Sequence, residues 1–160
     1  MALGDNTLRS AAGNSQRGRN PYMVQTTLNW ATALSDKGSA LAAADVIPVI
    51  AVPKGTMVLN AGIEVDTATD GSTFTVDLGM VDADVFVDGF DATSAAAVVA
   101  QNPAAYQPVM AVADDNIDVT IATLSGGAVT SGKFRVWAVL MDCTDMGDTA
   151  ADEVARDALA

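Results

Sequence analysis

Residues 45–77 have the sequence DVIPVIAVPKGTMVLNAGIEVDTATDGSTFTVD, which predicts three β-strands in close succession. An apolar run leads into the turn at residues 53–55, and a longer strand then extends to a second turn at residues 67–72. The third strand follows directly. Because the same alternation of short strands and tight turns continues to residue 142, the chain is expected to be all-β.

Further strands are expected on both sides of this segment. Alternating or short apolar runs mark them at residues 22–30, 85–86, 117–121 and 133–141. Seven to nine short strands separated by turns indicate a β-sandwich or jelly roll. We expect three parts along the chain: an extended N-terminal arm at 1–21, the sandwich or jelly-roll domain at 22–142, and an acidic C-terminal tail or short helix at 143–160.

Two other segments have patterns that suit helices. Residues 91–106 predict a short helix capped by Asp91 and ended before Pro103, or alternatively a loop across one end of the barrel. In residues 148–160, Thr149 is placed to cap a helix whose apolar side chains have helical spacing: Ala151, Val154, Ala155, Ala158 and Leu159. So short a helix needs to dock on this body or on a neighbour to be stable.

The strand that follows the 53–55 turn is expected to have two distinct faces. The side chains sharing one face are Met57, Leu59, Ala61, Ile63 and Val65. The opposite face would carry Thr56, Asn60, Glu64 and Asp66. Gly62 predicts a bulge or bend within this strand. Pro48 places the preceding strand at a sheet edge or a bulge, because proline cannot donate to the ladder.

The usage of cysteine and histidine excludes several kinds of catalytic and metal site. Cys143 is the single cysteine, which rules out an intrachain disulfide and a multi-cysteine zinc site. The chain has no histidine, so histidine-based nucleophile activation and imidazole metal sites are absent. No apolar run approaches the ~20 residues of a membrane-spanning helix, and the N-terminus lacks a secretory signal. We therefore expect no enzyme, no cofactor and no membrane partner.

The charge is strongly acidic and unevenly distributed, with a net value of −12. Residues 21–141 have a net charge of −9, and residues 142–160 have a net charge of −5. An acidic body is repelled by phosphate backbones, so nucleic-acid binding is not expected. Residues 1–20 form the one basic stretch, with a net charge of +2 from three arginines and a single acid: Arg9, Arg17 and Arg19.

Two acidic clusters raise the question of calcium binding. They comprise Asp82, Asp84, Asp88 and Asp91, and Asp114, Asp115, Asn116 and Asp118. Hard cations bind several oxygen ligands from a compact loop, but neither spacing matches an EF-hand. Solvated loop carboxylates are favoured at both places. The acids also make a poor glycosidase pair, because such a site usually has aromatic platforms and no Trp or Tyr lies beside them in sequence.

Two interpretations are open for the two tryptophans, Trp30 and Trp137. Either both pack in the core, or one lies on a face that contacts another subunit. Trp137 shares its face with Val139 and Met141, whereas the opposite face of that strand is already fully apolar. A strand that is apolar on both faces is either central in a two-layer body or exposed to a partner. We expect one of the two tryptophan faces to contribute to a subunit interface.

Four segments follow one another in a characteristic order: IPVIAVPKGTMVLNAGIEVDTA, TFTVDLG, DADVFVDGFDAT and IDVTIATLSGGAVTSGKFRVWAVLMD. Together they cover roughly residues 45–142. This order resembles small virion proteins of tailed bacteriophages, namely capsid decoration (cement) proteins and related head or tail accessory subunits. In that family a PxGTxVLxAGxEV segment, an LG…DAD.FVD segment and a closing GKxRVxAVxxD strand recur.

The resemblance implies a non-catalytic subunit that binds the outer surface of the major capsid protein shell through a β body and an extended arm. Arg9, Arg17 and Arg19 would then pair with acidic shell residues, and the implied oligomer is a homotrimer. The implied location is the capsid exterior of a virion, after synthesis in the host cytoplasm. Three alternatives are a phage tail, neck or head-fibre accessory subunit, a carbohydrate-binding adhesion module, and a small β-barrel enzyme or ligand carrier.

Overall fold

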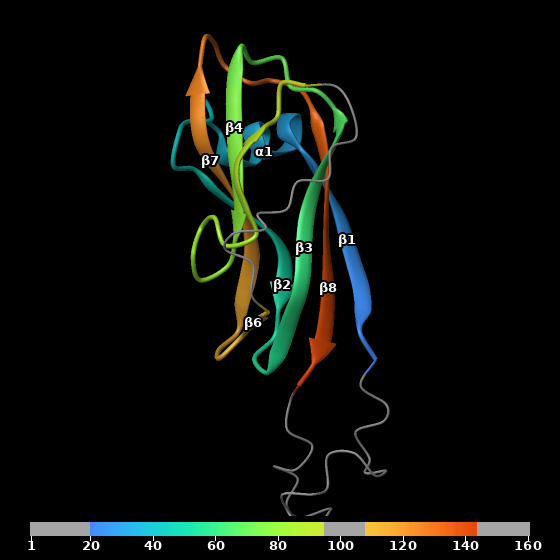
Figure 1. Ribbon diagram of the computed structural model, residues 1–160. Coiled ribbons are helices and arrows are strands. Elements are labelled where there is room, and N and C mark those ends of the chain that lie inside the picture. The colour runs from blue at the N-terminus through green and yellow to red at the C-terminus, as the bar shows by residue number, and fades with distance from the viewer. Residues whose placement is uncertain (1–19, 95–107, 144–160) are drawn as a thin grey trace, which may run out of the picture.

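The computed structural model describes residues 20–94 and 108–143 (Figure 1). Eight strands and one short helix are present in these residues. In chain order they are β1 (Tyr22–Asn29), α1 (Trp30–Lys37), β2 (Val46–Val52), β3 (Thr56–Thr67), β4 (Thr73–Gly79), β5 (Val87–Asp91), β6 (Val109–Met110), β7 (Asp115–Ser125) and β8 (Lys133–Asp142).

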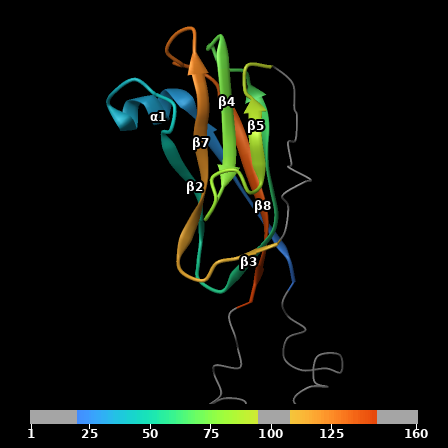
Figure 2. The same ribbon diagram turned by 60° about the vertical axis from the view of Figure 1, so that its left-hand side comes forward.

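The strands form two four-stranded antiparallel sheets, which face each other in Figures 1 and 2. Their strand orders are β1-β8-β3-β6 and β2-β7-β4-β5. The strand pairs are nested as in one long antiparallel hairpin that folds over into two sheets. They are β1–β8, β2–β7, β3–β6 and β4–β5. This pairing is the jelly-roll arrangement of antiparallel strands. The predicted all-β fold, a sandwich of the jelly-roll kind, is therefore confirmed.

The core lies between the sheets and centres on three fully buried aromatic side chains, Trp30, Phe74 and Phe134. The ring of Trp30 lies 4.8 Å from that of Phe74 and 5.2 Å from that of Phe134, both in edge-to-face geometry. Aliphatic side chains from both sheets surround this cluster: Val58, Ala61, Ile63, Val76, Leu78, Ile117, Val119, Ile121, Val136 and Ala138.

Helix α1 corrects the prediction that the first strand extends over residues 22–30. The side-chain oxygen of Asn29, the last residue of β1, accepts the N–H of Ala31 at 3.0 Å and caps the helix. Gly38 ends the helix with a left-handed φ of 69°. Trp30 therefore begins a helix, and its side chain packs between Phe74 of β4 and Phe134 of β8.

A bulge in β3 corrects the predicted faces of that strand. The register against β8 shifts between Val58 and Asn60, which leaves Leu59 as an extra residue. Because of this extra residue, even-numbered side chains face the core before the bulge and odd-numbered side chains face it after the bulge. Val58 is therefore buried, while Met57 faces outward. The core-facing part of the predicted set is confined to Ala61, Ile63 and Val65.

Other local predictions have mixed outcomes. Pro48 lies in the edge strand β2, and the register shifts between Pro48 and Ile50, so both the edge and the bulge expectations are confirmed. The bulge expected at Gly62 is wrong, because Gly62 pairs in regular register with Trp137. The short strand expected at residues 85–86 begins later, as β5, and the two-residue strand β6 was not predicted.

Three predicted segments lie wholly or largely outside the described residues. They are the N-terminal arm, the helix or loop of residues 91–106, and the C-terminal tail. At the described start of the second segment, Asp91 is the last residue of β5.

Candidate interface on the outer face of one sheet

The outer face of the β1-β8-β3-β6 sheet carries the candidate site. Along β8 the inward side chains are buried, whereas Trp137, Val139 and Met141 lie on the outer face and are half-buried. The two sides alternate because successive residues of a strand face opposite ways. The structure therefore brings three of the predicted interface residues together.

The neighbouring strands extend this apolar surface on both sides of β8. Met23 of β1 lies opposite Val139, and Met57 of β3 lies opposite Met141. Beyond β3, Met110 of β6 lies opposite Met57. Four of the five methionines in the described residues thus lie on this face, and we call them the methionine patch: Met23, Met57, Met110 and Met141.

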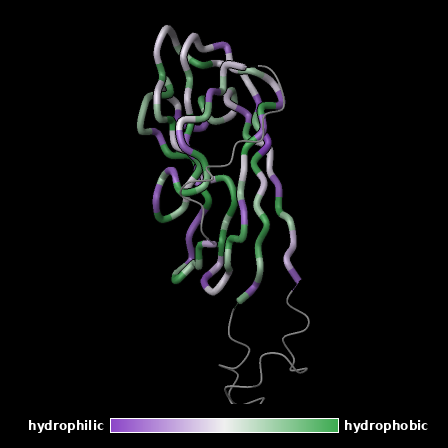
Figure 3. The backbone as a smooth tube through the Cα atoms, in the orientation of Figure 1, coloured by the Kyte–Doolittle hydropathy of each residue, from purple (hydrophilic) through white to green (hydrophobic). Residues whose placement is uncertain are grey.

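The methionine patch is partly open to solvent. Met23 is 63% exposed and Met110 is 38% exposed, whereas Met57 and Met141 are half-buried. Figure 3 shows mostly hydrophobic colouring along the lower parts of β3 and β8. Methionine is unbranched and adapts its shape to irregular surfaces, so it is frequent at protein-binding faces. This end of the sheet is therefore suited to contact another protein surface.

The indole ring of Trp137 packs against β3 at Gly62. A Cβ atom at position 62 would lie 2.5 Å from Cζ2 and 2.7 Å from Cε2 of the Trp137 ring. Gly62 itself is buried, although it lies on the outer side of β3. The indole ring therefore covers the place where other residues would have a side chain, and it keeps the apolar face continuous across β8 and β3.

The other end of the same face is charged. Nη1 of Arg135 donates to Oε2 of Glu64 at 3.0 Å, across the β8–β3 pair. Exposed pairs of this kind contribute only about 0.2–1 kcal/mol to stability. Lys133 is exposed beyond this pair. Arg135 and Lys133 therefore mark where the apolar surface ends, and the ion pair contributes little to the stability of the fold.

The outer face of the opposite sheet is acidic. Asp77 of β4, Asp91 of β5 and Asp118 of β7 lie on it. Burial raises the pKa of Asp118, and the nearby charge of Asp115 raises it further. Hydrogen bonds from Thr93 lower the pKa of Asp91. The two outer faces of the sandwich thus differ in character, since one is apolar and the other carries carboxylates.

The first candidate calcium cluster has Asp82 and Asp84 in the β4–β5 loop and Asp88 and Asp91 in β5. A hydrogen bond with Asp82, together with the charges of Asp82 and Asp88, raises the pKa of Asp84. Asp91 instead accepts the N–H of Thr93 at 2.9 Å and its hydroxyl at 2.7 Å. Within the described part of the chain, no three Asp, Glu or Cys side chains are grouped so as to hold a metal ion.

The carboxylates of the second acidic cluster stabilise turns. Oδ1 of Asp114 accepts the N–H of Lys54 at 2.9 Å, which joins the β2–β3 turn to the loop before β7. Oδ1 of Asp115 accepts the N–H of Asn116 at 2.8 Å. The Asp114 carboxylate therefore links two loops, whereas the Asp115 carboxylate binds the backbone next to it.

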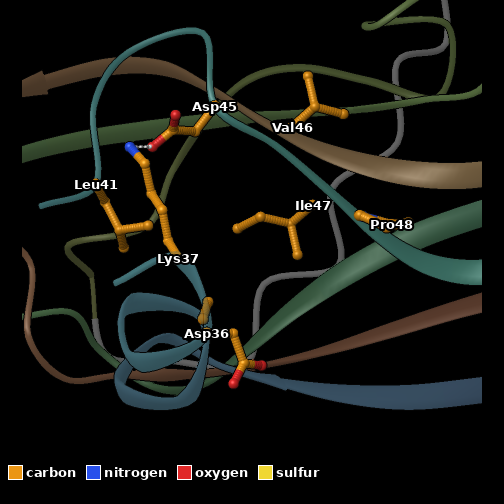
Figure 4. A pocket seen from close by; sticks show the side chains of 8 residues that line it. Asp36, Lys37, Leu41, Asp45, Val46, Ile47 and Pro48 are labelled. Atoms are coloured by element: carbon orange, nitrogen blue, oxygen red, sulfur yellow. Dashed lines mark hydrogen bonds and ion pairs between the residues drawn. The ribbon is translucent and has the colours of Figure 1, made fainter. Parts of the chain in front are cut away.

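A pocket of about 380 Å³ lies between α1 and the edge strand β2 (Figure 4). Nζ of Lys37 donates to Oδ2 of Asp45 and to the carbonyl of Ala40, so both charges of the pair are compensated inside the protein. The walls are mainly apolar and include Leu41 and Ile47. The charged side chains of the lining are Asp36, Lys37 and Asp45.

The predicted interface residues have three different outcomes. Trp30 is completely buried, so it is a core residue and cannot meet a partner in this fold. Trp137, Val139 and Met141 share the outer face, and their role as an interface stays a prediction. The arm arginines lie outside the described residues: Arg9, Arg17 and Arg19.

Three members of the apolar face were not predicted. Met23 alternates with Val24 in the sequence, so its outward position could have been inferred from the strand pattern. Met57 was assigned to the wrong face because of the β3 bulge. Met110 belongs to a two-residue strand, which is too short to produce a periodic signal.

No family model and no curated protein sequence matches this chain. Three solved structures that are similar to this chain come from phage capsids. A chain of the cyanophage Pam1 capsid asymmetric unit is 18% identical, with a TM-score of 0.60 over 88% of this chain and 97% of that chain. A chain of the capsid of Ralstonia phage GP4 is 16% identical, with a TM-score of 0.57 over 79% of this chain and 86% of that chain.

A third similar chain belongs to the acidic stable capsid structure of Helicobacter pylori bacteriophage KHP30. It is 14% identical, with a TM-score of 0.51 over 77% of this chain and 89% of that chain. At these identities the similarity establishes a shared fold. Among the described residues, no helix has the length and apolar character needed to cross a bilayer.

Proposed function

We propose that this protein is a structural virion subunit, and more narrowly a decoration (cement) protein on the outer surface of a tailed-phage capsid. The observation that carries this proposal is the near-complete match to whole chains from three phage capsids. Between 86% and 97% of each of those chains aligns with this one. They are therefore small subunits of similar length, and not large shell proteins that contain a jelly roll as one part.

The two outer faces of the sandwich support a position on the capsid exterior. The apolar face around Trp137, Val139 and Met141 would contact the major capsid protein or a second copy of this chain, where burial of methionine and tryptophan stabilises binding. The acidic face with Asp77 and Asp118 would point to solvent. Such a face is repelled by packaged nucleic acid, which disfavours the capsid interior.

The N-terminal arm is proposed to add the contacts that a small body lacks. Residues 1–20 are basic, whereas the rest of the chain is acidic. Its arginines would form charge-assisted hydrogen bonds with carboxylates of the shell. The proposed oligomer is a homotrimer, as the resemblance implies, and repeated contacts at symmetry-related positions would reinforce the shell. No reaction is proposed, because a subunit of this kind acts through binding alone.

Deletion of residues 1–20 tests the shell-binding proposal. We expect the truncated protein to retain its β-type circular dichroism but to lose binding to expanded capsids, measured by co-sedimentation and by the copy number per particle. Loss of charge at the three arginines (R9Q, R17Q, R19Q) should weaken binding and make the remainder less sensitive to salt. The matched control R156Q removes a charge from the tail and should bind normally. Unchanged occupancy after the deletion contradicts the proposal.

One observation weighs against the carbohydrate-binding alternative. Sugar-binding surfaces usually present exposed aromatic rings, and among the described residues Tyr22 is the one large aromatic side chain that is exposed, at 45%.

The alternative of a tail or neck subunit also makes this protein part of the virion. Mass spectrometry of separately purified heads and tails distinguishes it, since a decoration subunit is expected in the head fraction.

A further inference from the structure

The methionine patch exposes apolar surface at one end of the sheet. Met23 and Met110 are the most exposed members, at 63% and 38%. The neighbouring outward positions Gln25 and Asn60 are uncharged, and they lie opposite Trp137 and Val139. Contiguous apolar surface of this kind promotes association of free subunits in solution. A free subunit is therefore stabilised by any segment that covers the patch.

The chain leaves the sandwich right beside this patch. Met141 is the second residue before Cys143, whose N–H donates to the carbonyl of Gly55 at 2.8 Å. This bond fixes the end of β8 against the β2–β3 turn. Tyr22 pairs with Leu140, so the first strand begins at the same end of the molecule, as Figure 1 also shows. The two terminal segments of the chain are both attached next to the exposed methionines.

The sequence of the C-terminal segment is complementary to the patch. A helix over residues 149–160 would be about 18 Å long, at 1.5 Å per residue. The apolar face from Trp137 to Met141 spans about 13 Å along β8, and four strands at ~4.8 Å spacing span about 14 Å across it. The stripe formed by Ala151, Val154, Ala155, Ala158 and Leu159 therefore matches the face in size.

We propose that residues 149–160 dock as an amphipathic helix on the methionine patch of their own subunit before assembly. Five residues, 144–148, connect the end of β8 to this helix, which suffices for reversal of the chain. So short a connection gives the segment a high effective concentration at its own patch. The polar side of the helix is acidic and would face solvent. Contact with a shell protein or a second copy would then displace the segment.

Methionine oxidation in the full-length free protein tests the docking. Hydrogen peroxide oxidises the patch methionines only while the segment is undocked. If the segment is docked about three quarters of the time, their oxidation rate is therefore about fourfold lower than without it. In V154D, which puts a charge into the apolar stripe, we expect Met57 and Met141 to oxidise about fourfold faster than in the wild type, as measured by peptide mass spectrometry. The control A160D adds the same charge on the opposite side of the helix and should leave the rates unchanged.

Met80 serves as an internal reference, because it is only 8% exposed and lies outside the patch. Its rate should not change in either variant, and an increase would indicate loss of folding. Equal rates for the patch methionines in V154D, A160D and the wild type would overturn the proposal. A rate change at the patch after deletion of residues 1–20, but not in V154D, would identify the arm as the occupant and would also overturn it.

A disulfide experiment distinguishes the same subunit from a neighbouring one. In a C143S background, the pair V139C and V154C should form a crosslinked monomer on a non-reducing gel. The control pair A122C and V154C places the first thiol on exposed β7 and should not crosslink. Crosslinked dimers would place the segment on a neighbour and contradict the proposal. These results concern the free subunit, so they hold or fail independently of capsid binding.

Discussion

The ring of Trp137 occupies space that only a glycine at position 62 leaves open. Cζ2 of the ring would lie 2.5 Å from an added Cβ, well inside van der Waals contact. The residue pattern of β3 does not explain why position 62 is a glycine. The explanation is the contact with Trp137, which lies 75 positions further along the chain on β8. The sequence therefore suggested a local bend at Gly62, whereas the physical cause is a contact between two strands.

We expect G62A to destabilise the protein by roughly 1 kcal/mol, because the ring has to move outward. Part of this cost is offset by the smaller backbone entropy of alanine in the unfolded chain. The measurements are urea denaturation and tryptophan fluorescence, which should shift to the red as Trp137 becomes more exposed.

The double-mutant cycle with W137A isolates this contact. Without the ring, G62A should be neutral or slightly stabilising. The same loss of stability in both backgrounds would show that the contact with Trp137 is not the cause.

At the scale of elements, Asp70 connects two loops at the end of the sandwich opposite the methionine patch. Its Oδ1 accepts the N–H groups of Thr130 at 2.9 Å and Ser131 at 3.1 Å, and Oδ2 accepts the Thr130 hydroxyl. The β3–β4 turn is thereby joined to the β7–β8 loop. These hydrogen bonds favour the ionised carboxylate and lower the pKa of Asp70 to about 2.

This lowered pKa predicts a pH-dependent contribution to stability. Because the pKa is lower in the folded state than the usual 3.8, the contribution is complete well above pH 3.8 and is lost as the pH falls towards 2. We expect D70N to lower the melting temperature by no more than a few degrees near pH 6, since Asp70 is exposed and solvent weakens its bonds. The difference from the wild type should shrink as the pH falls towards 2, where Asp70 becomes protonated in the folded state as well.

Thermal unfolding followed by circular dichroism from pH 2 to pH 7 measures this effect. The control D66N changes an exposed carboxylate at the end of β3. A difference between D70N and the wild type that is constant over the whole pH range would contradict the assigned role of the charged carboxylate.

The strands and the helix could be predicted more accurately where the alternation of apolar and polar residues covered more positions. β8 has ten residues of regular alternation, and its buried and outward faces follow directly from the sequence. Helix α1 has only eight residues, and Leu28 and Trp30 continue the alternation of β1 into it. Its signals were the cap residues, Asn29 before it and Gly38 after it, which suit a helix as well as a turn.

The candidate interface was predictable along one strand but not across the sheet. Trp137, Val139 and Met141 could be grouped from the alternation within β8. Which residues lie beside them depends on strand pairing at large sequence separation, and for Met57 also on the bulge at Leu59. A single sequence carries no direct signal for either.

At the scale of the whole molecule, the contrast between an apolar and an acidic face predicts how copies associate. We expect W137D to weaken self-association by about tenfold or more in dissociation constant, because a charge placed in the centre of the proposed interface must be desolvated. Analytical ultracentrifugation over a range of concentrations measures the effect.

The control A122D adds the same charge at an exposed position on β7 and should associate like the wild type. W137D should keep the circular dichroism of the wild type and unfold cooperatively, at a lower temperature because the contact of the ring with Gly62 is lost. A W137D variant that does not fold would instead assign Trp137 to the core, and a wild type that is monomeric at every concentration would contradict the homo-oligomer.

The opposite ends of β8 have a practical consequence for attaching foreign peptides. The chain leaves the body at Cys143, beside the proposed contact face, so a cargo fused to the C-terminus would compete with assembly. The β7–β8 loop lies about 33 Å away, at the other end of the ten-residue strand. There Gly127 has open space around it, so an epitope inserted between Gly126 and Gly127 should be displayed away from the proposed contact face without disturbing the core.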